Sequence, residues 1–182
     1  MNQPSLVWLD LEMTDLDPVL GRIVEIATVI TDAKLHIIAK GPDLVIHESP
    51  EILSKMVNWN QEHFHESGLM DEITSSKITL REAEQAILKF ISQYFEPQKA
   101  ILAGNSVYVD REFVSVHMPE LSSYLHYRII DVNTIRELAI RWFPNLPKFP
   151  KNEKHRAMSD NLESIDELKY YQVNMFRDLH EN

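Results

Sequence analysis

The sequence of 182 residues contains no cysteine. This absence excludes a disulfide framework, zinc sites built from thiolates and enzymes that use a cysteine nucleophile. Only four glycines occur, and they are too scattered for the glycine-rich loops that hold nucleotide phosphates. No apolar run approaches the roughly 20 residues that a membrane span needs, and the first residues lack the basic segment of a secretory signal. We therefore expect a cytoplasmic protein without membrane contact.

Positive charge is also in short supply. The chain has 18 Lys and Arg residues against 28 Asp and Glu residues, which gives a formal net charge of −10. Proteins that bind long nucleic acids usually present a basic stripe, and no run rich in Lys or Arg is present. Charge alone therefore argues against a nucleic-acid partner. One exception stays open, because carboxylates gathered around divalent cations can turn negative charge into a phosphate site.

The remaining composition is that of one globular domain. Apolar residues make up 44% of the chain and charged residues 25%, so the sequence can supply its own core. The length corresponds to one domain at about 100–200 residues per domain. No repeat, low-complexity tract or linker interrupts it, and we predict a single domain over residues 1–182.

The first half of the chain predicts strands. The segments 6–12 and 23–30 are apolar or rich in β-branched residues, and short turn-forming segments separate them. A third strand is expected over 35–39, with 44–47 as a possible continuation beyond the turn at Gly41 and Pro42. Strands with such short connections are expected to be antiparallel neighbours.

The second half alternates between helices and strands. Thr79, with Glu82 three residues later, has the pattern of a capping box at the start of a helix that ends before Pro97. We expect strands over 100–104 and 127–132, helices through Asp110 to Pro119 and over 133–142, a loop over 145–154 and a final helix over 159–180. This order predicts an α/β domain whose mixed sheet is flanked by helices on both faces.

Two acidic residues end the first strand. Asp10 and Glu12 are two residues apart, so their side chains leave the strand on the same face. Acids in an otherwise apolar strand are costly to bury unless they are paired or bind a metal. The alternative is a strand end at which both acids reach water.

Three further candidates stand near the starts of helices. Asp110 follows the strand at 100–104, and His155 precedes Asp160 by five residues. Each carboxylate has an ordinary explanation, since acids are favoured in the first turn of a helix and Asp160 with Glu163 resembles a capping box. Five helical steps would place His155 and Asp160 about 140° apart. The histidine must therefore lie on non-helical chain if both are to face one site.

Taken together, these residues form a known pattern. Asp10-x-Glu12, then Asp110, then His155-x4-Asp160 resembles the DEDDh 3′→5′ exonucleases, whose fold is ribonuclease-H-like. The similarity is greatest to the oligoribonuclease family and extends from Leu6 to about Tyr171. Five blocks carry it in this order: residues 8–14, 104–106, 110–113, 126–135 and 155–160.

The resemblance implies a metal-dependent 3′→5′ exoribonuclease that cuts very short oligoribonucleotides, notably dinucleotides, to 5′-mononucleotides. The four acids would hold two divalent cations, Mg²⁺ or Mn²⁺, which prefer oxygen ligands. Two such ions stabilise the attacking and leaving oxygens of a phosphoryl displacement. His155 would accept the proton of the attacking water, for which a pKa of about 6.5 is suitable. The family also implies a homodimer.

Further residues match substrate-binding positions of that family. Leu16 resembles an apolar wedge between the last two bases, although ordinary loop packing would also explain it. Trp59 and Phe64 match residues that line the base pocket, and Phe64 stands where relatives commonly carry histidine. Four residues match the positions around the 5′-phosphate of a short RNA: Ser106, Arg128, Asn133 and Thr134. Asn133 replaces a serine but keeps a donor, and an exposed ion pair would also explain Arg128.

Three other departures from the family pattern remove no catalytic group. Tyr108 and Val109 replace a Gly-Gln pair before Asp110, and Ser159 replaces the first acid of an Asp-Asp pair. Two alternative functions stay open. An exonuclease of the same family could act on longer strands, although the lack of a basic track disfavours it. A binding protein with a structural metal cluster is disfavoured because such a site has no use for a base at His155.

Overall fold

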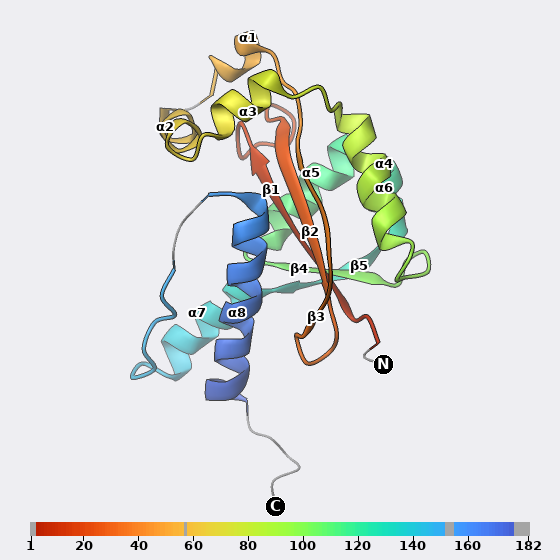
Figure 1. The fold of residues 1–182 in the computed structure, drawn as a ribbon. Helices are drawn as coiled ribbons and strands as arrows, with labels where there is room; N and C mark the ends of the chain where they lie inside the picture. Colours follow the sequence, from red (N-terminus) through yellow and green to blue (C-terminus); the bar gives the residue numbers. More distant parts are fainter. Residues whose placement is uncertain (1–2, 57, 152–154, 177–182) are drawn as a thin grey trace, which may run out of the picture.

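The structure, a computed structural model, describes residues 3–56, 58–151 and 155–176. Its described strands form one sheet in the order β3-β2-β1-β4-β5 (Figure 1). The pairs β1–β2 and β2–β3 are antiparallel, whereas β1–β4 and β4–β5 are parallel. The predicted mixed sheet is therefore confirmed. Its strands are β1 (Leu6–Met13), β2 (Ile23–Thr31), β3 (Ile37–Val45), β4 (Ala100–Gly104) and β5 (Leu125–Asp131).

Strand β3 is continuous, where the sequence suggested an interruption at Gly41 and Pro42. The pairing of β3 with β2 shifts register at this point, between Ala27 and Val29. An edge strand tolerates a proline because the missing N–H leaves no partner unsatisfied on the solvent side. Gly41 is required there, since a Cβ atom would collide with the side chains of Thr28 and Phe90.

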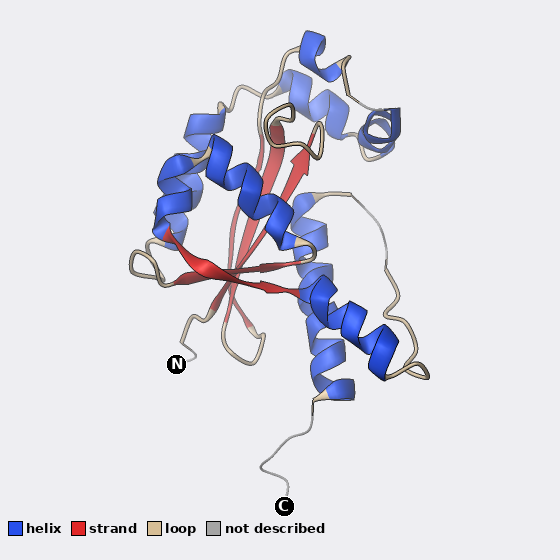
Figure 2. Ribbon diagram, turned by 180° about the vertical axis from the view of Figure 1, so that it is seen from behind, coloured by secondary structure: helices blue, strands red, loops and turns tan. Residues whose placement is uncertain are grey.

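Helices cover both faces of the sheet, as predicted (Figure 2). Side chains alternate along β1, so Val7, Leu9 and Leu11 pack in one core cluster and Trp8 in another. The first cluster lies under α4 (Leu80–Ile91), α5 (Val107–His117) and α6 (Pro119–Tyr124). The second lies under α7 (Val132–Trp142) and α8 (Ala157–Met175). Asp10 and Glu12 have the same parity as Trp8 and therefore face α8.

Three short helices near the end of β1 were not predicted individually. They are α1 (Pro50–Leu53), α2 (Asn58–Glu66) and α3 (Leu69–Ser75), and they share a small core cluster with Val24 of β2. The sequence of α2 is mostly polar, so its periodicity gives little signal. The three helices form a layer above the ends of β1 and β2 in Figure 1.

Helix boundaries follow the sequence closely where a cap is present. The capping box at Thr79 and Glu82 is confirmed, since the Glu82 backbone N–H donates to Thr79 Oγ1 at 3.2 Å and the Thr79 N–H to Glu82 Oε2 at 2.8 Å. Helix α8 begins at Ala157, two residues earlier than predicted, so Asp160 lies inside the first turn and is not the cap. The helix ends at Met175, where Phe176 has an extended backbone, five residues before the predicted end at 180. No helix in the described ranges is long and apolar enough to cross a membrane.

Candidate active site

Three carboxylates from two elements meet at the carboxyl end of β1. Asp10 and Glu12 come from β1, and Asp160 comes from the first turn of α8. One oxygen of each side chain lies within 4.8 Å of the other two. The alternation of β1 and the packing of α8 on that face of the sheet produce this arrangement, which we call the acidic cluster.

Asp110 reaches the same strand from the opposite face of the sheet. The Leu11 backbone N–H donates to Asp110 Oδ1 at 3.0 Å. Strand β4 pairs with β1 only over Leu6–Trp8, so beyond that point β1 has no strand partner on this side. The carboxylate of Asp110 takes the place of the missing strand and lies next to Asp10, whose pKa its charge raises.

The pKa values of all four acids are raised. Burial is the largest cause, and it raises the pKa of Glu12 to about 8 and that of Asp110 to about 7. Burial also raises the pKa of Asp10 well above its usual value, and repulsion from Asp110 and Glu12 adds to the effect. The pKa of Asp160 is raised mainly by burial, although the charge of His155 opposes the shift. Burial and mutual repulsion therefore disfavour four charged carboxylates here.

Divalent cations would remove this penalty. Carboxylate oxygens are the preferred ligands of Mg²⁺ and Mn²⁺, and the acidic cluster offers three from separate side chains. Asp110 contributes a fourth beside them. The donor set therefore fits hard divalent cations, whereas it offers no sulfur and few nitrogens to softer metals.

His155 lies on non-helical chain, as the spacing required. Its φ is +48°, and it directly precedes Arg156, the N-cap of α8. The His155 ring contacts His63 of α2 edge to face, with 4.6 Å between the ring centroids. It lies five residues before Asp160, just ahead of the first turn of α8, and its charge opposes the rise in the pKa of that acid.

The sequence interpretation missed Glu25, which faces the site from β2. Glu25 pairs with Glu12 across the strands and is only 1% exposed. It accepts hydrogen bonds from Arg156 Nε at 3.0 Å and from the Ala157 backbone N–H at 3.2 Å. The signal that singled out Asp10 and Glu12, an acid inside an apolar strand, is equally present at Glu25.

Three of the predicted phosphate-binding residues lie together. Asp131 Oδ1 accepts hydrogen bonds from the backbone N–H groups of Ser106 at 3.0 Å and Asn133 at 2.9 Å. Thr134 and Asp131 line one open hollow of about 460 Å³ with Tyr108. The Asp131 charge also contributes to the raised pKa of Asp110, after burial of that carboxyl.

Arg128 does not join that group within the described chain. Its side chain lies along β5, where Nε donates to the Tyr127 hydroxyl at 3.1 Å and the guanidinium lies 5.5 Å from the centre of the Tyr127 ring. Leu16 is 76% exposed in the loop after β1, which leaves it available to a ligand.

The expectation from the resemblance that Phe64 lines the base pocket needs correction. Phe64 is only 2% exposed and packs with Val24, Leu53 and Ile73 in the cluster beneath α2 and α3. Its apolar ring is more stable in this core than in a wet pocket, and its neighbour His63 faces the site instead. Trp59 belongs to the first turn of α2, and its side chain lies outside the described residues.

Comparisons with known proteins show the family to which the chain belongs. The family model described as "Exonuclease" matches residues 7–168. A probable oligoribonuclease of Dictyostelium discoideum is 49% identical over 172 residues, which cover 94% of this chain and 90% of that protein. The oligoribonuclease of Escherichia coli K12 is 46% identical over 177 residues, which cover 97% and 98% of the two chains.

Solved structures of exonuclease I share the fold. The enzyme from Methylocaldum szegediense superposes with a TM-score of 0.67 at 16% identity, over 93% of this chain and 40% of that one. The Escherichia coli enzyme in complex with a dT13 oligonucleotide superposes with a TM-score of 0.62 at 17% identity, over 96% of this chain and 42% of that one. The chain thus spans about two fifths of those exonucleases. At this identity the likeness shows the fold, which is the predicted ribonuclease-H-like one.

Proposed function

Because this chain belongs to the oligoribonuclease family of metal-dependent exonucleases, we propose that it is a 3′→5′ exoribonuclease for very short RNA. Its products would be 5′-mononucleotides, and dinucleotides would be its best substrates. The observation that carries the proposal is the acidic cluster with His155 beside it. A purely structural metal site would have no use for a titratable base at its edge.

The reaction assigned to this site is hydrolysis of the last phosphodiester bond. Asp10, Glu12, Asp110 and Asp160 would hold two cations, Mg²⁺ or Mn²⁺. When bound, such ions lower the pKa of water and stabilise charge on the attacking and leaving oxygens. His155 accepts the proton of the water whose oxygen attacks phosphorus, and the bond from phosphorus to the 3′-oxygen breaks. A solvent proton completes the released 3′-hydroxyl.

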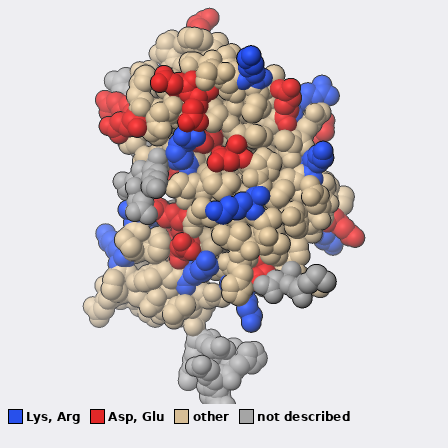
Figure 3. Space-filling view, viewed as in Figure 1, with Lys and Arg blue, Asp and Glu red and all other residues tan. Residues whose placement is uncertain are grey.

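The charge on one face of the molecule supports short substrates over long ones. On the face shown in Figure 3, Lys and Arg residues are scattered among acidic residues and form no continuous stripe. Binding of a long strand gains affinity from counterion release only where cations follow its backbone. Ser106, Asn133 and Thr134, which gather around Asp131, would hold the 5′-phosphate, and Leu16 would separate the two bases. Trp59 would line the base pocket.

We also propose that the protein is a homodimer, and that the dimer contact lies along β5. This strand is at the edge of the sheet and exposes Tyr127 (74%) and Ile130 (36%), with Tyr108 of α5 (54%) nearby. An apolar edge strand of this kind is prone to pair with a second chain. Sedimentation should give about 42 kDa, twice the 21.2 kDa of one chain. A fully active monomer would contradict the proposal.

Substrate length tests the proposed function. Equilibrium binding in Ca²⁺, which suppresses turnover, should show a steep loss of affinity as RNA grows from two nucleotides to about seven. A 5′-phosphate on the dinucleotide should add roughly 1.5–3 kcal/mol, the value of a hydrogen bond to a charged group. Arg128 points along β5 toward Tyr127, so it would have to turn toward the 5′-phosphate on binding; if it does, Arg128→Ala should remove most of that gain. Equal affinity for both lengths, with no effect of the 5′-phosphate, would favour the general exonuclease. If neither RNA is hydrolysed in the presence of Mg²⁺, both the short-RNA exoribonuclease and the general exonuclease are refuted.

A further inference from the structure

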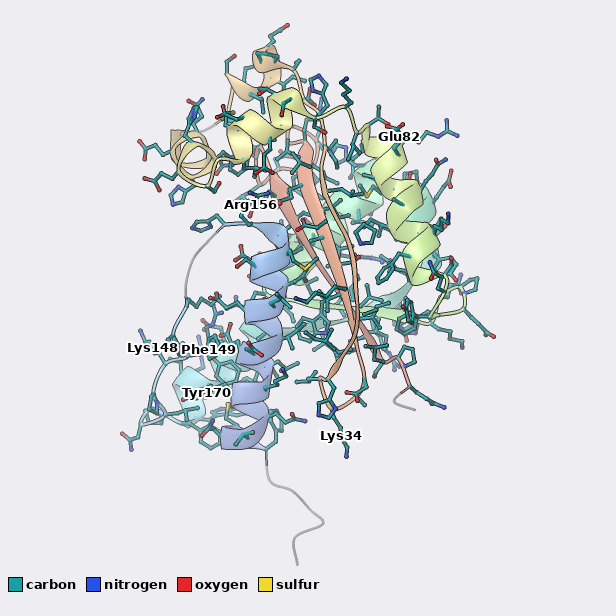
Figure 4. All side chains as sticks on the ribbon, in the orientation of Figure 1. Lys34, Glu82, Lys148, Phe149, Arg156 and Tyr170 are labelled. Atoms are coloured by element: carbon teal, nitrogen blue, oxygen red, sulfur yellow. The ribbon has the colours of Figure 1, made fainter. Side chains whose placement is uncertain are left out.

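Arg156 lies between two carboxylates that come from separate parts of the fold. Its Nε and Nη2 atoms are each 3.0 Å from Glu25 Oε1 of β2. Its Nη1 and Nη2 atoms donate to Glu72 Oε1 and Oε2 of α3 at 3.0 and 2.8 Å. We propose that this Glu25–Arg156–Glu72 clamp positions His155 for catalysis, an inference that rests on the proposed function. Figure 4 shows Arg156 at the start of α8, beneath α3.

The clamp acts on the backbone next to His155. Glu25 Oε2 accepts from the Ala157 N–H, while Glu25 Oε1 accepts from the Arg156 side chain. One buried carboxylate therefore fixes two consecutive residues, and the residue before them is His155. Because His155 has a left-handed φ of +48°, which a residue with a Cβ rarely adopts, its backbone needs such support from neighbouring contacts.

The second carboxylate connects this backbone to the helices above the site. Glu72 belongs to α3, which packs with α2 in one small cluster, and α2 carries the His63 ring against His155. His155 is thus held from two sides, by the chain that follows it and by the helical layer that covers it. Arg156 contributes to both supports. It binds Glu25, which holds the start of α8, and it binds Glu72 of α3, which packs with the helix that carries His63.

Electrostatics argue that Glu25 is more than a structural ion pair. Glu25 faces Glu12 across the strands, so two carboxylates of like charge lie side by side. An apolar side chain would suit this 1% exposed position in β2 and would remove that repulsion. The negative charge of Glu25 is therefore explained by its contacts, because Glu25 holds the start of α8.

Two variants test the clamp without leaving a buried charge unpaired. Glu72→Ala removes the half-exposed partner and keeps the Glu25 contact, and Arg156→Lys keeps the charge but cannot bridge two carboxylates. Both should lower kcat on a dinucleotide at least tenfold, since a displacement of about 1 Å in a catalytic group can cost 10²-fold. KM and Mn²⁺ affinity should stay within about threefold of wild type, because the cluster carboxylates are untouched. Glu51→Ala, which removes the exposed ion pair between Glu51 of α1 and Lys55, is the matched control and should leave kcat, KM and Mn²⁺ affinity unchanged.

Hydrogen exchange gives a readout that needs no activity. The Ala157 amide should exchange faster in Glu72→Ala and Arg156→Lys than in wild type or Glu51→Ala. A kcat within twofold of wild type in both variants would overturn the clamp, and so would a tenfold loss of Mn²⁺ affinity, which would place the effect on the metal ligands. If wild type hydrolyses no RNA, the proposed function fails, and an unchanged Ala157 exchange rate would then refute the clamp separately.

Discussion

Two acids on α8 lie seven residues apart, about two helical turns, and have opposite environments. Glu167 has a side chain only 1% exposed and is paired with Arg136, whose Nε and Nη2 atoms donate to its two oxygens at 2.7 and 2.6 Å. Asn105 and Tyr171 donate to the same carboxylate. Asp160 instead faces Asp10 and Glu12.

The pKa shifts follow from these surroundings. Burial alone would raise the pKa of Glu167, but the hydrogen bonds from Arg136 and Asn105 outweigh it and lower the pKa. Burial raises the pKa of Asp160, and the partial opposition from His155 does not reverse the shift. A buried acid that serves the fold has its counter-charge built into the chain. We propose that Asp160 is instead neutralised by a bound metal ion, and this contrast distinguishes the candidate site from the paired acid Glu167.

The largest effect is expected from Asp110→Asn. The substitution should abolish hydrolysis because it removes one ligand charge, while the amide oxygen can still accept the hydrogen bond from the Leu11 N–H. The pKa of Asp110 is raised to about 7, so loss of its charge should not destabilise the metal-free protein. Steady-state kinetics and urea unfolding measure the two quantities. Turnover within tenfold of wild type would refute a ligand role.

The substitution His155→Ala should cause the next largest loss of activity. We expect the rate to fall by about 10²–10⁴, the usual contribution of a positioned acid–base group. Mn²⁺ affinity should be retained, because His155 is not one of the carboxylate ligands. A variant with a normal rate at neutral pH would show that the proton of the attacking water goes elsewhere.

Arg136→Ala breaks the paired region and should affect the fold. It leaves the buried Glu167 carboxylate with a weaker set of partners, including Lys151 at 3.6 Å. We expect the free energy of unfolding to fall by about 3 kcal/mol, the lower end for a broken buried pair. Arg141→Ala removes an exposed pair on the same helix and should cost less than about 1 kcal/mol. An equal decrease in the free energy of unfolding in the two variants would show that the Glu167 network stabilises the fold no more than an exposed ion pair does.

The smallest expected effect is a change of Tm with pH and with Mn²⁺. Because the folded-state pKa values of Glu12 and Asp110 are raised, to about 8 and about 7, the stability they contribute is present below their unfolded pKa values and is lost as pH rises. The Tm of the metal-free protein should therefore fall between about pH 5 and pH 8 from this cause. Mn²⁺ binds deprotonated carboxylates, so it should raise Tm more at about pH 8 than at pH 5.5. A stabilisation by Mn²⁺ that is independent of pH would contradict this assignment.

The sequence predicted the framework of the site because its signals are local. Parity along 6–12 places Asp10 and Glu12 on one face, and the capping box at Thr79 marks the start of α4. The need for non-helical chain at His155 follows from helical geometry and agrees with its φ of +48°. The resemblance to the DEDDh exonucleases, and not spacing alone, grouped the four acids into one site.

What the sequence missed depends on contacts between distant segments. The Arg156–Glu25 and Arg156–Glu72 contacts join residues 131 and 84 positions apart, which no local pattern reports. The burial of Phe64 was missed for a similar reason, since its core is formed by β2, α1 and α3 around a mostly polar helix. The resemblance fixed its position in the motif but not the direction of its side chain.

Calorimetric titration with Mn²⁺ tests the central claim that the acidic cluster is a divalent-metal centre. Wild type, Asp160→Asn and Asp166→Asn should be compared at about pH 7.5, where ligand carboxylates can release their protons to the metal. Asp166 is an exposed residue of the same helix that pairs with Lys169, so Asp166→Asn makes the same chemical change away from the cluster. We predict that wild type and Asp166→Asn bind two Mn²⁺ ions alike and that Asp160→Asn loses at least one of them. Identical binding by all three proteins would contradict the account.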